Sequence, residues 1–215
     1  MLVYSQITFQ DLRDRFGIQV ETEPFLPQII PLALPDWLIK YLAVNKLSPS
    51  LAKSEKAVSE MLIAPMLSAV KEYNADTISL FSGEPLTMTG ELSGVCDFII
   101  AANPKAYLPE PPIMVLVEAK KQDLYGGIPQ CIAEMLTARS VNNRAGIQYE
   151  AIFGCVTTGN EWLFLKLSGN RAITDPAIFY YPELDWVLFS GSLTNSQSLI
   201  PSPDKLDDLP NKRPC

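Results

Sequence analysis

The most informative absence in this chain is histidine, which does not occur among its 215 residues. Without imidazole, the Ser-His-Asp and Cys-His nucleophilic arrangements, histidine-rich zinc sites and histidine general bases are all excluded. Any catalysis must therefore depend on carboxylates, lysine, hydroxyl groups or a bound metal ion.

Cysteine is also sparse, and its four residues form no CxxC pair that would indicate a zinc site. They are widely spaced, at Cys96, Cys131, Cys155 and Cys215. No basic segment followed by an apolar one, the pattern of a secretory signal, is found near residue 1. The most apolar long stretch, Leu26 to Val44, is interrupted by prolines and charges that a membrane-spanning helix does not tolerate cheaply. We therefore expect a soluble, cytoplasmic protein with reduced, buried thiols and no membrane partner.

Positive charge is in deficit, because 17 Lys and Arg stand against 24 Asp and Glu, for a net charge of −7. Proteins that follow a phosphate backbone usually carry a basic stripe. The balance therefore argues against tight binding of duplex nucleic acid, although a local basic rim remains compatible with it. The candidates for that rim are Lys105, Lys120, Lys121, Arg139 and Arg144.

The length favours one globular domain, or one with a modest appendage, and a hydrophobic content of 47% is sufficient for a sizeable core. Residues 1–50 read as a covering segment with a helix that opens at Thr8 and ends at Gly17, a strand over Ile18 to Thr22, and a second helix from Asp36 through Val44. Residues 51–195 read as the core, and residues 196–215 as a flexible tail.

The core shows a change of hydrophobic period. From Ser54 the apolar residues recur at helical spacing, with a break expected near Met61 because Pro65 lies inside the pattern. A later helix begins at Ile128-Pro129 and is expected to be amphipathic up to about Asn143. The strands are expected at Thr77–Ser82, Glu91–Ala101, Ile113–Ala119, Glu150–Thr157 and Glu161–Leu167, followed by a last helix from Pro182. This order predicts an α/β fold with a mixed central sheet flanked by helices.

Three charged residues occupy unusual places in the predicted strands. Asp97 lies inside an apolar strand, and Glu118 and Lys120 close the next one. Residues at i and i+2 of a strand point to the same face, and antiparallel pairing of the two strands would place Asp97 opposite them. Two carboxylates about 4 Å apart repel by roughly 4 kcal/mol at an effective dielectric constant of 20, so the pair needs a proton, a cation or separation.

A hard divalent cation would resolve this repulsion. Mg²⁺ or Mn²⁺ binds carboxylate oxygens and keeps waters, one of which can attack a phosphodiester. Lys120 would orient or deprotonate that water and stabilise the extra negative charge. Glu55, beside the apolar stripe of its helix, could add a third acidic group, and Gln130, in the first turn after Pro129, could hold a water or a phosphate.

With these residues in this order, the chain resembles the PD-(D/E)XK nuclease superfamily, whose restriction endonuclease-like core is αβββαβ. The segment SEKAVSEMLIAPML and the hairpin FGCVTTGNEWLFLKL are similar to nuclease domains of type I restriction subunits and of stand-alone bacterial relatives, and the resemblance spans Ser54 to Leu167. It implies that Asp97, Glu118 and Glu55 serve as metal ligands, that Lys120 assists the attacking water, and that Gln130 supports the site. Cys96 stands where the motif's name has proline.

The resulting hypothesis is a metal-dependent nuclease that hydrolyses nucleic acid, with DNA as the expected substrate and Mg²⁺ or Mn²⁺ as cofactor. A homodimer is compatible with it, since many such nucleases cut two strands with two copies. Two alternatives stay open: a non-catalytic binding or assembly protein that keeps the nuclease fold, and a small-molecule or nucleotide phosphohydrolase. The remaining charges Glu60, Lys121, Asp123 and Glu134 are expected to be exposed, and Trp162 to pack in the core.

Overall fold

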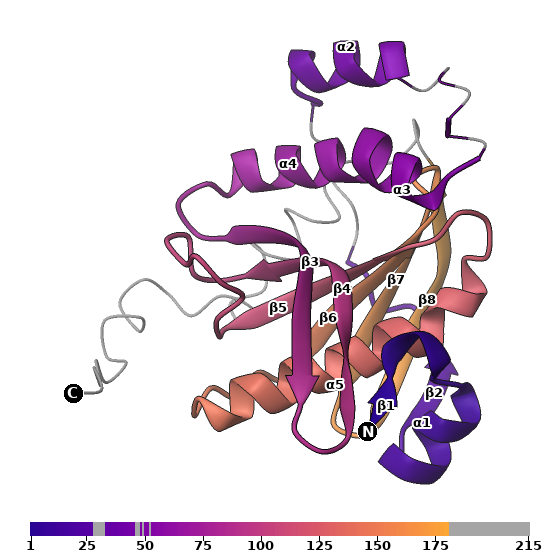
Figure 1. Cartoon of the computed structure of the whole chain (residues 1–215), viewed down its shortest axis with the longest axis vertical. Helices are drawn as coiled ribbons and strands as arrows, with labels where there is room; N and C mark the ends of the chain where they lie inside the picture. Colours follow the sequence, from indigo (N-terminus) through magenta and orange to yellow (C-terminus); the bar gives the residue numbers. More distant parts are fainter. Residues whose placement is uncertain (28–32, 46–47, 49, 52, 181–215) are drawn as a thin grey trace.

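Helices pack on both faces of one mixed, eight-stranded sheet (Figure 1). The computed structural model describes residues 1–27, 33–45, 48, 50–51 and 53–180. The strand order is β1-β4-β5-β6-β7-β8-β2, and β3 pairs with β4 outside this path. The predicted α/β class with a mixed sheet is confirmed. The helix predicted from Pro182, the tail 196–215 and Cys215 lie outside the described residues.

The centre of the sheet is formed by β4 (Leu92–Ala101), β5 (Ile113–Ala119) and β6 (Ile152–Thr157). β4 and β5 are antiparallel, with Phe98 opposite Val117, whereas β5 and β6 are parallel. Every residue of β5 is buried, as its continuous apolar run predicts. The remaining core strands are β3 (Ser79–Met88), β7 (Glu161–Ser168) and β8 (Arg171–Tyr180). β3 is antiparallel to β4, β7 to β6, and β8 to β7.

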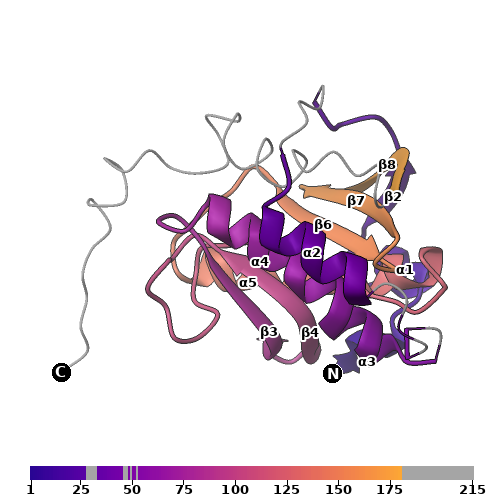
Figure 2. The same ribbon diagram turned by 90° about the horizontal axis from the view of Figure 1, so that it is seen from above.

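One face of the sheet is covered by an interrupted helix. α3 (Glu55–Val58) continues through a π-helical turn (Ser59–Ile63) into α4 (Ala64–Tyr73). Pro65 has no N–H for the carbonyl of Met61, so the regular hydrogen-bond ladder cannot pass this point, and the predicted break is confirmed. α2 (Asp36–Asn45) packs on the outer side of this helix, where Figure 2 shows it lying over α4.

The opposite face is covered by α5 (Ile128–Arg144), and here the expectation of an amphipathic helix is wrong. Most residues of α5 are buried, because the sheet packs on one side and a 3₁₀ turn (Tyr4–Gln6) and α1 (Phe9–Phe16) pack on another. Polar residues on α5 are therefore taken into the interior, among them Glu134 and Asn142.

The N-terminal segment does more than cover the core. α1 has the predicted boundaries, with Thr8 capping its first turn and Gly17 ending it at a φ of 65°. The segment also adds two strands that join the sheet at separate places: β1 (Leu2–Val3) runs parallel to β4, and β2 (Gln19–Thr22) runs parallel to β8. The sequence predicts β2 but neither β1 nor β8. Among the described residues no helix is both long and apolar enough to cross a bilayer.

Asn142 fastens α5 to the central strand, which gives a test of the packing. Its buried amide accepts a hydrogen bond from the Ile113 backbone N–H at 2.8 Å and donates one to the Ile113 carbonyl at 2.7 Å. Because Asn142→Leu leaves two buried backbone groups without partners, we expect it to lower the free energy of unfolding by about 2 kcal/mol or more. Chemical denaturation measures this change. Asn143, the exposed neighbour of Asn142 on α5, provides the control. A similar loss of stability in Asn143→Leu would contradict this role of Asn142.

Candidate active site

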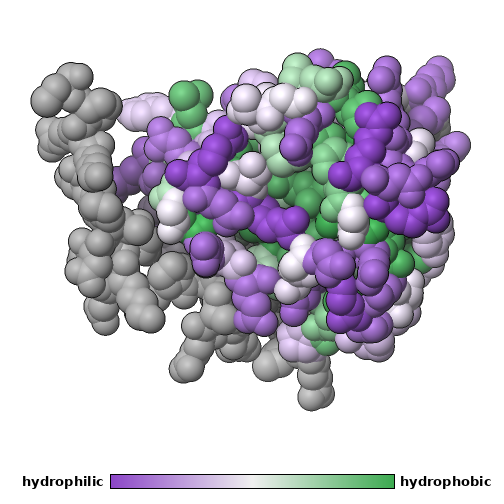
Figure 3. Space-filling view, turned by 90° about the horizontal axis from the view of Figure 1, so that it is seen from below, coloured by the Kyte–Doolittle hydropathy of each residue, from purple (hydrophilic) through white to green (hydrophobic). Residues whose placement is uncertain are grey.

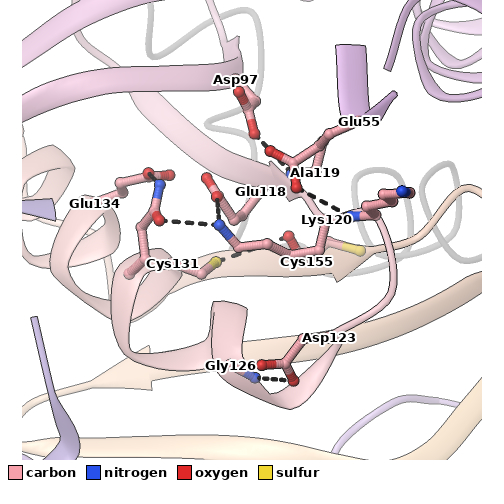
Figure 4. A network of polar contacts seen from close by, with 12 residues as sticks. Glu55, Asp97, Glu118, Ala119, Lys120, Asp123, Gly126, Cys131, Glu134 and Cys155 are labelled. Atoms are coloured by element: carbon pink, nitrogen blue, oxygen red, sulfur yellow. Dashed lines mark hydrogen bonds and ion pairs between the residues drawn. The ribbon is translucent and has the colours of Figure 1, made fainter. Parts of the chain in front are cut away.

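Three of the predicted residues meet where β4 and β5 separate, next to α5 (Figure 4). Beyond the Phe98–Val117 pair, Asp97 turns its carboxylate to the neighbouring strand, and Asp97 Oδ2 accepts the Ala119 N–H at 2.8 Å. On β5, the predicted i and i+2 arrangement is observed directly, because Lys120 Nζ lies 2.5 Å from Glu118 Oε1. The antiparallel pairing that brings Asp97 to these residues is confirmed.

α5 supplies the next contacts. Lys120 Nζ donates to Gln130 Oε1 at 3.1 Å, and Gln130 Nε2 donates to Glu134 Oε1 at 3.3 Å. Gly127, which precedes α5, makes room for this approach: a Cβ there would lie 2.6 Å from Val156 Cγ1 and 3.1 Å from Lys120 Cγ. The glycine before the helix therefore permits the lysine to pass close to the backbone and reach Gln130.

Glu55 enters from the other face of the sheet as the first residue of α3, whose start is capped by Ser54. Glu55 Oε2 accepts the Lys121 backbone N–H at 3.1 Å, so the helix is tied to the chain directly after β5. The negative charge of Glu55 acts on both Asp97 and Lys120. The structure thus brings all five predicted residues, from α3, β4, β5 and α5, around one region, as Figure 4 shows for four of them by name.

The electrostatics of this region are dominated by burial. Loss of hydration raises the pKa of Asp97, although the Ala119 N–H and the charge of Lys120 oppose the shift. Burial and then repulsion from Asp97 raise the pKa of Glu118 to about 7. Burial works against a charged Lys120, but its hydrogen bond to Glu118 and the surrounding negative charges outweigh burial and raise its pKa. Lys120 is therefore an ammonium ion at neutral pH.

Glu134 is the residue that the sequence reasoning misses. It is expected to be exposed, yet its exposed fraction is 0%, and Glu118 beside it is only 2% exposed. Within the described part of the chain, Glu118 Oε2 and Glu134 Oε2 are the two buried carboxylate oxygens without a hydrogen-bond partner. Burial, followed by repulsion from Glu118, raises the pKa of Glu134 well above its usual range. The sequence signal that could have found Glu134 is its spacing. Glu134 follows Gln130 by four residues, about one helical turn, so the two side chains lie on the same face of the helix.

The donor set suits a hard divalent cation bound by few protein ligands. Asp97 and Glu118 offer carboxylate oxygens, and among the described residues Glu118 Oε2 lacks a hydrogen-bond partner and Lys120 forms the one ion pair with Glu118. Mg²⁺ typically takes one or two carboxylates and completes its shell with water and substrate oxygens. Among residues 1–180, outside the gaps noted above, no group of three or more His, Cys, Asp or Glu is arranged so that it could hold a metal ion. A site with two carboxylate ligands, Asp97 and Glu118, stays a prediction, as does Glu55 as a third ligand.

The wider basic rim is not assembled. Arg139 donates to the Gly169 carbonyl, and Arg144 donates to Thr87 and Thr89 at the tip of the β3–β4 hairpin. At 1.5 Å per residue, Arg144 is roughly 21 Å along α5 from Gln130. These arginines belong to the end of the molecule that carries α1 and that hairpin, where Figure 3 shows apolar atoms between hydrophilic side chains. Lys120 and the exposed Lys121 remain as the positive charges next to the site.

The predictions for the other side chains agree with the structure. Glu60, Lys121 and Asp123 are exposed, and Trp162 is fully buried, as expected. Cys96, Cys131 and Cys155 are free and buried, also as expected. No protein-family model matches this chain, and comparison with curated proteins gives no significant match.

The buried Glu134 predicts a specific pH dependence of stability. A carboxyl group whose pKa is raised on folding contributes its full stability below the ordinary pKa of glutamate, and that contribution is lost as the pH rises through the raised value. Glu134→Gln keeps the acceptor for Gln130 but cannot ionise. We expect the free energy of unfolding of the wild type to fall between pH 5 and pH 8 by about 1 kcal/mol more than that of the variant.

Denaturant unfolding at each pH measures this difference. The exposed Glu60 gives the matched control, and Glu60→Gln should follow the wild-type curve. Parallel curves for the wild type and Glu134→Gln would show that Glu134 is not held in the neutral form by its surroundings.

Proposed function

We propose that this chain is a metal-dependent nuclease of the PD-(D/E)XK kind, which hydrolyses phosphodiester bonds in nucleic acid, with DNA as the expected substrate. The observation that carries the proposal is the convergence of Asp97, Glu118 and Lys120 at the point where β4 and β5 separate. Asp97, Glu118 and Glu55 place three carboxyl groups around one ammonium ion. Such a site favours a divalent cation, and through it a phosphate.

The order of elements supports the same proposal. The interrupted α3–α4 helix, the antiparallel β3–β4–β5 unit, the α5 helix and the parallel β6 follow one another in the αβββαβ order that the resemblance implies. Asp97 and Glu118 lie on the second and third of these strands, and Gln130 lies in the first turn of the second helix. The spacing of the motif therefore agrees with the placement of its elements.

The chemistry can be divided among the residues. A divalent ion, when bound by Asp97 and Glu118, would neutralise charge on the scissile phosphate and make a water a better nucleophile. The surrounding carboxyl groups raise the pKa of Lys120, which favours its ammonium form. As an ammonium ion, Lys120 would donate hydrogen bonds to the negative charge that develops on the phosphate. Orientation or deprotonation of the water by Lys120 stays a prediction.

Gln130 and Glu134 would hold Lys120 in place for this task. Gln130 Oε1 faces the ammonium and Gln130 Nε2 faces the Glu134 carboxyl group. A flipped amide would place its NH₂ group against the ammonium of Lys120, so Lys120 favours the observed orientation. The amide oxygen thus serves as an acceptor for Lys120.

One specific observation favours the non-catalytic alternative. The 2.5 Å ion pair between Lys120 and Glu118 already gives the buried carboxylate a partner, as a purely structural ion pair would. Among the described residues the ion pair leaves the second oxygen of Glu118 without a hydrogen-bond partner, whereas Asp97 accepts the Ala119 N–H. The nuclease proposal makes that oxygen of Glu118 a metal ligand, whereas the structural alternative requires a proton on the adjacent Glu134.

A cleavage assay with paired variants tests the proposal. Purified protein is incubated with single-stranded and double-stranded DNA and RNA in Mg²⁺ or Mn²⁺, beside Asp97→Ala and Lys120→Ala. Because each variant removes a group that stabilises charge in the transition state, we expect the cleavage rate to fall by about 100-fold or more.

The exposed residues Lys71 and Asp76 provide controls of the same types, and Lys71→Ala and Asp76→Ala should keep full activity. Circular dichroism and thermal unfolding establish that each variant is folded. Cleavage that survives in both site variants would point to a contaminating nuclease, and no cleavage by the wild type of any of the four substrates would favour the non-catalytic alternative.

A further inference from the structure

A pocket of about 440 Å³ is lined by Lys121, the residue that follows Lys120 in the chain. It lies beyond the ends of β5 and β6, which are parallel, so their carboxyl ends share one edge of the sheet. Lys121 and Gln122 follow β5 there, and Thr158 and Asn160 follow β6. In α/β sheets, ligands bind in this position, and the volume lies in the usual range for small-molecule pockets. Figure 1 shows α3 beside this end of the sheet.

One wall of the pocket is apolar and firmly supported. Leu51, Val58 and Leu62 form it, the last from the π-helical turn, a feature that often marks functional sites. The β6–β7 turn rests directly against this wall. At Gly159, with a φ of 80°, a Cβ would lie 3.0 Å from Val58 Cγ1 and 3.1 Å from Leu62 Cδ1. The wall and the turn therefore hold each other in place, and the pocket is built into the fold.

The opposite wall carries neutral polar groups. Gln122 and Asn160 contribute exposed amides, and the turn is fixed by Thr158, whose Oγ1 accepts the Glu161 N–H at 3.1 Å. Lys121 and Glu161 add one positive and one negative charge to the lining, so its net charge is zero. A lining without net charge does not suit a phosphate group. It suits a flat heterocycle with apolar faces and a polar edge, and a nucleobase is such a group.

The pocket is joined to the carboxylate cluster by one residue. Lys121 lines the pocket with its side chain, while its backbone N–H is bound by Glu55, one of the acidic residues of the site. Lys120, the residue before it, contacts Glu118. A base in the pocket would thus belong to a nucleotide next to the phosphate at Asp97 and Glu118.

We propose that this pocket holds an unpaired nucleobase next to the cleaved phosphodiester, and that the substrate is single-stranded or locally unpaired nucleic acid. This inference rests on the nuclease function proposed above. It also agrees with the charge balance, because a chain of net charge −7 in which Arg139 and Arg144 bind backbone carbonyls elsewhere gains little from phosphate contacts. Burial of a base supplies affinity that does not depend on a basic surface.

An abasic scan tests the inference. Bases of a short single-stranded oligodeoxynucleotide are removed one at a time while every phosphodiester is kept, and cleavage in Mg²⁺ is followed. We expect an abasic residue next to the cleaved bond to raise KM by about fivefold or more, as the loss of one bound base implies, and abasic residues elsewhere to have no effect. The same sequence as an intact duplex should be cleaved more slowly.

Asn160→Trp, which fills the mouth of the pocket, should raise KM for the intact strand and abolish its difference from the abasic strand. Asn170→Trp makes the same change in the exposed β7–β8 turn and should behave as the wild type. Cleavage that is indifferent to both the abasic residue and Asn160→Trp would overturn the pocket and leave the nuclease function standing. Faster hydrolysis of free nucleoside monophosphates than of the strand would also overturn it.

A binding measurement separates failure of the pocket from failure of the nuclease function. Fluorescence anisotropy of the labelled oligodeoxynucleotide is recorded with the wild type, Asn160→Trp and Asn170→Trp. If no substrate is cleaved but the strand binds and Asn160→Trp alone abolishes binding, the pocket is supported and the nuclease function is not. If Asn160→Trp binds the strand as tightly as the wild type does, the pocket does not hold a base.

Discussion

Burial of three carboxyl groups around a single ammonium ion is the constraint on which the site depends. Asp97, Glu118 and Glu134 share a poorly hydrated region, and Lys120 is the cation that contacts it. Burial raises the pKa of each carboxyl group, whereas the same negative surroundings raise the pKa of the amine. Such a region is stable only with protons or with a further cation, and the two can replace one another. This exchange is what would make the site responsive to a divalent ion.

The fold creates this constraint by covering α5 on two sides. The sheet buries the face that carries Gln130 and Glu134, and the N-terminal 3₁₀ turn and α1 bury much of what remains. The N-terminal segment also pairs with the sheet through β1 and β2. It therefore contributes to the burial of the site, although none of the predicted site residues belongs to it. Gly127 completes the arrangement by allowing Lys120 to pass between α5 and β6.

Much of this site could be predicted from the sequence because its signals are local. Asp97 is a charge inside an apolar run, Glu118 and Lys120 are two residues apart on a strand, and Pro65 marks the helix break. Features that depend on distant segments could not be predicted. Glu134 looks like a surface residue until the sheet is known to cover its face of α5, and β8 has Asp175 and Pro176 in the middle of its pattern. The pocket beside the site is formed by a helix and a turn about 100 residues apart, so no single stretch indicates it.

Calorimetric titration with Mn²⁺ tests the central claim most directly, because it measures cation binding without requiring any substrate. The account predicts that the wild type binds Mn²⁺ at a specific site, that Glu118→Gln abolishes this binding while the protein remains folded, and that Glu60→Gln, an exposed change of the same kind, leaves it intact. Absence of specific binding by the wild type, or equal binding by Glu118→Gln, would contradict it, since Lys120 would then be the only charge that the buried carboxylates require.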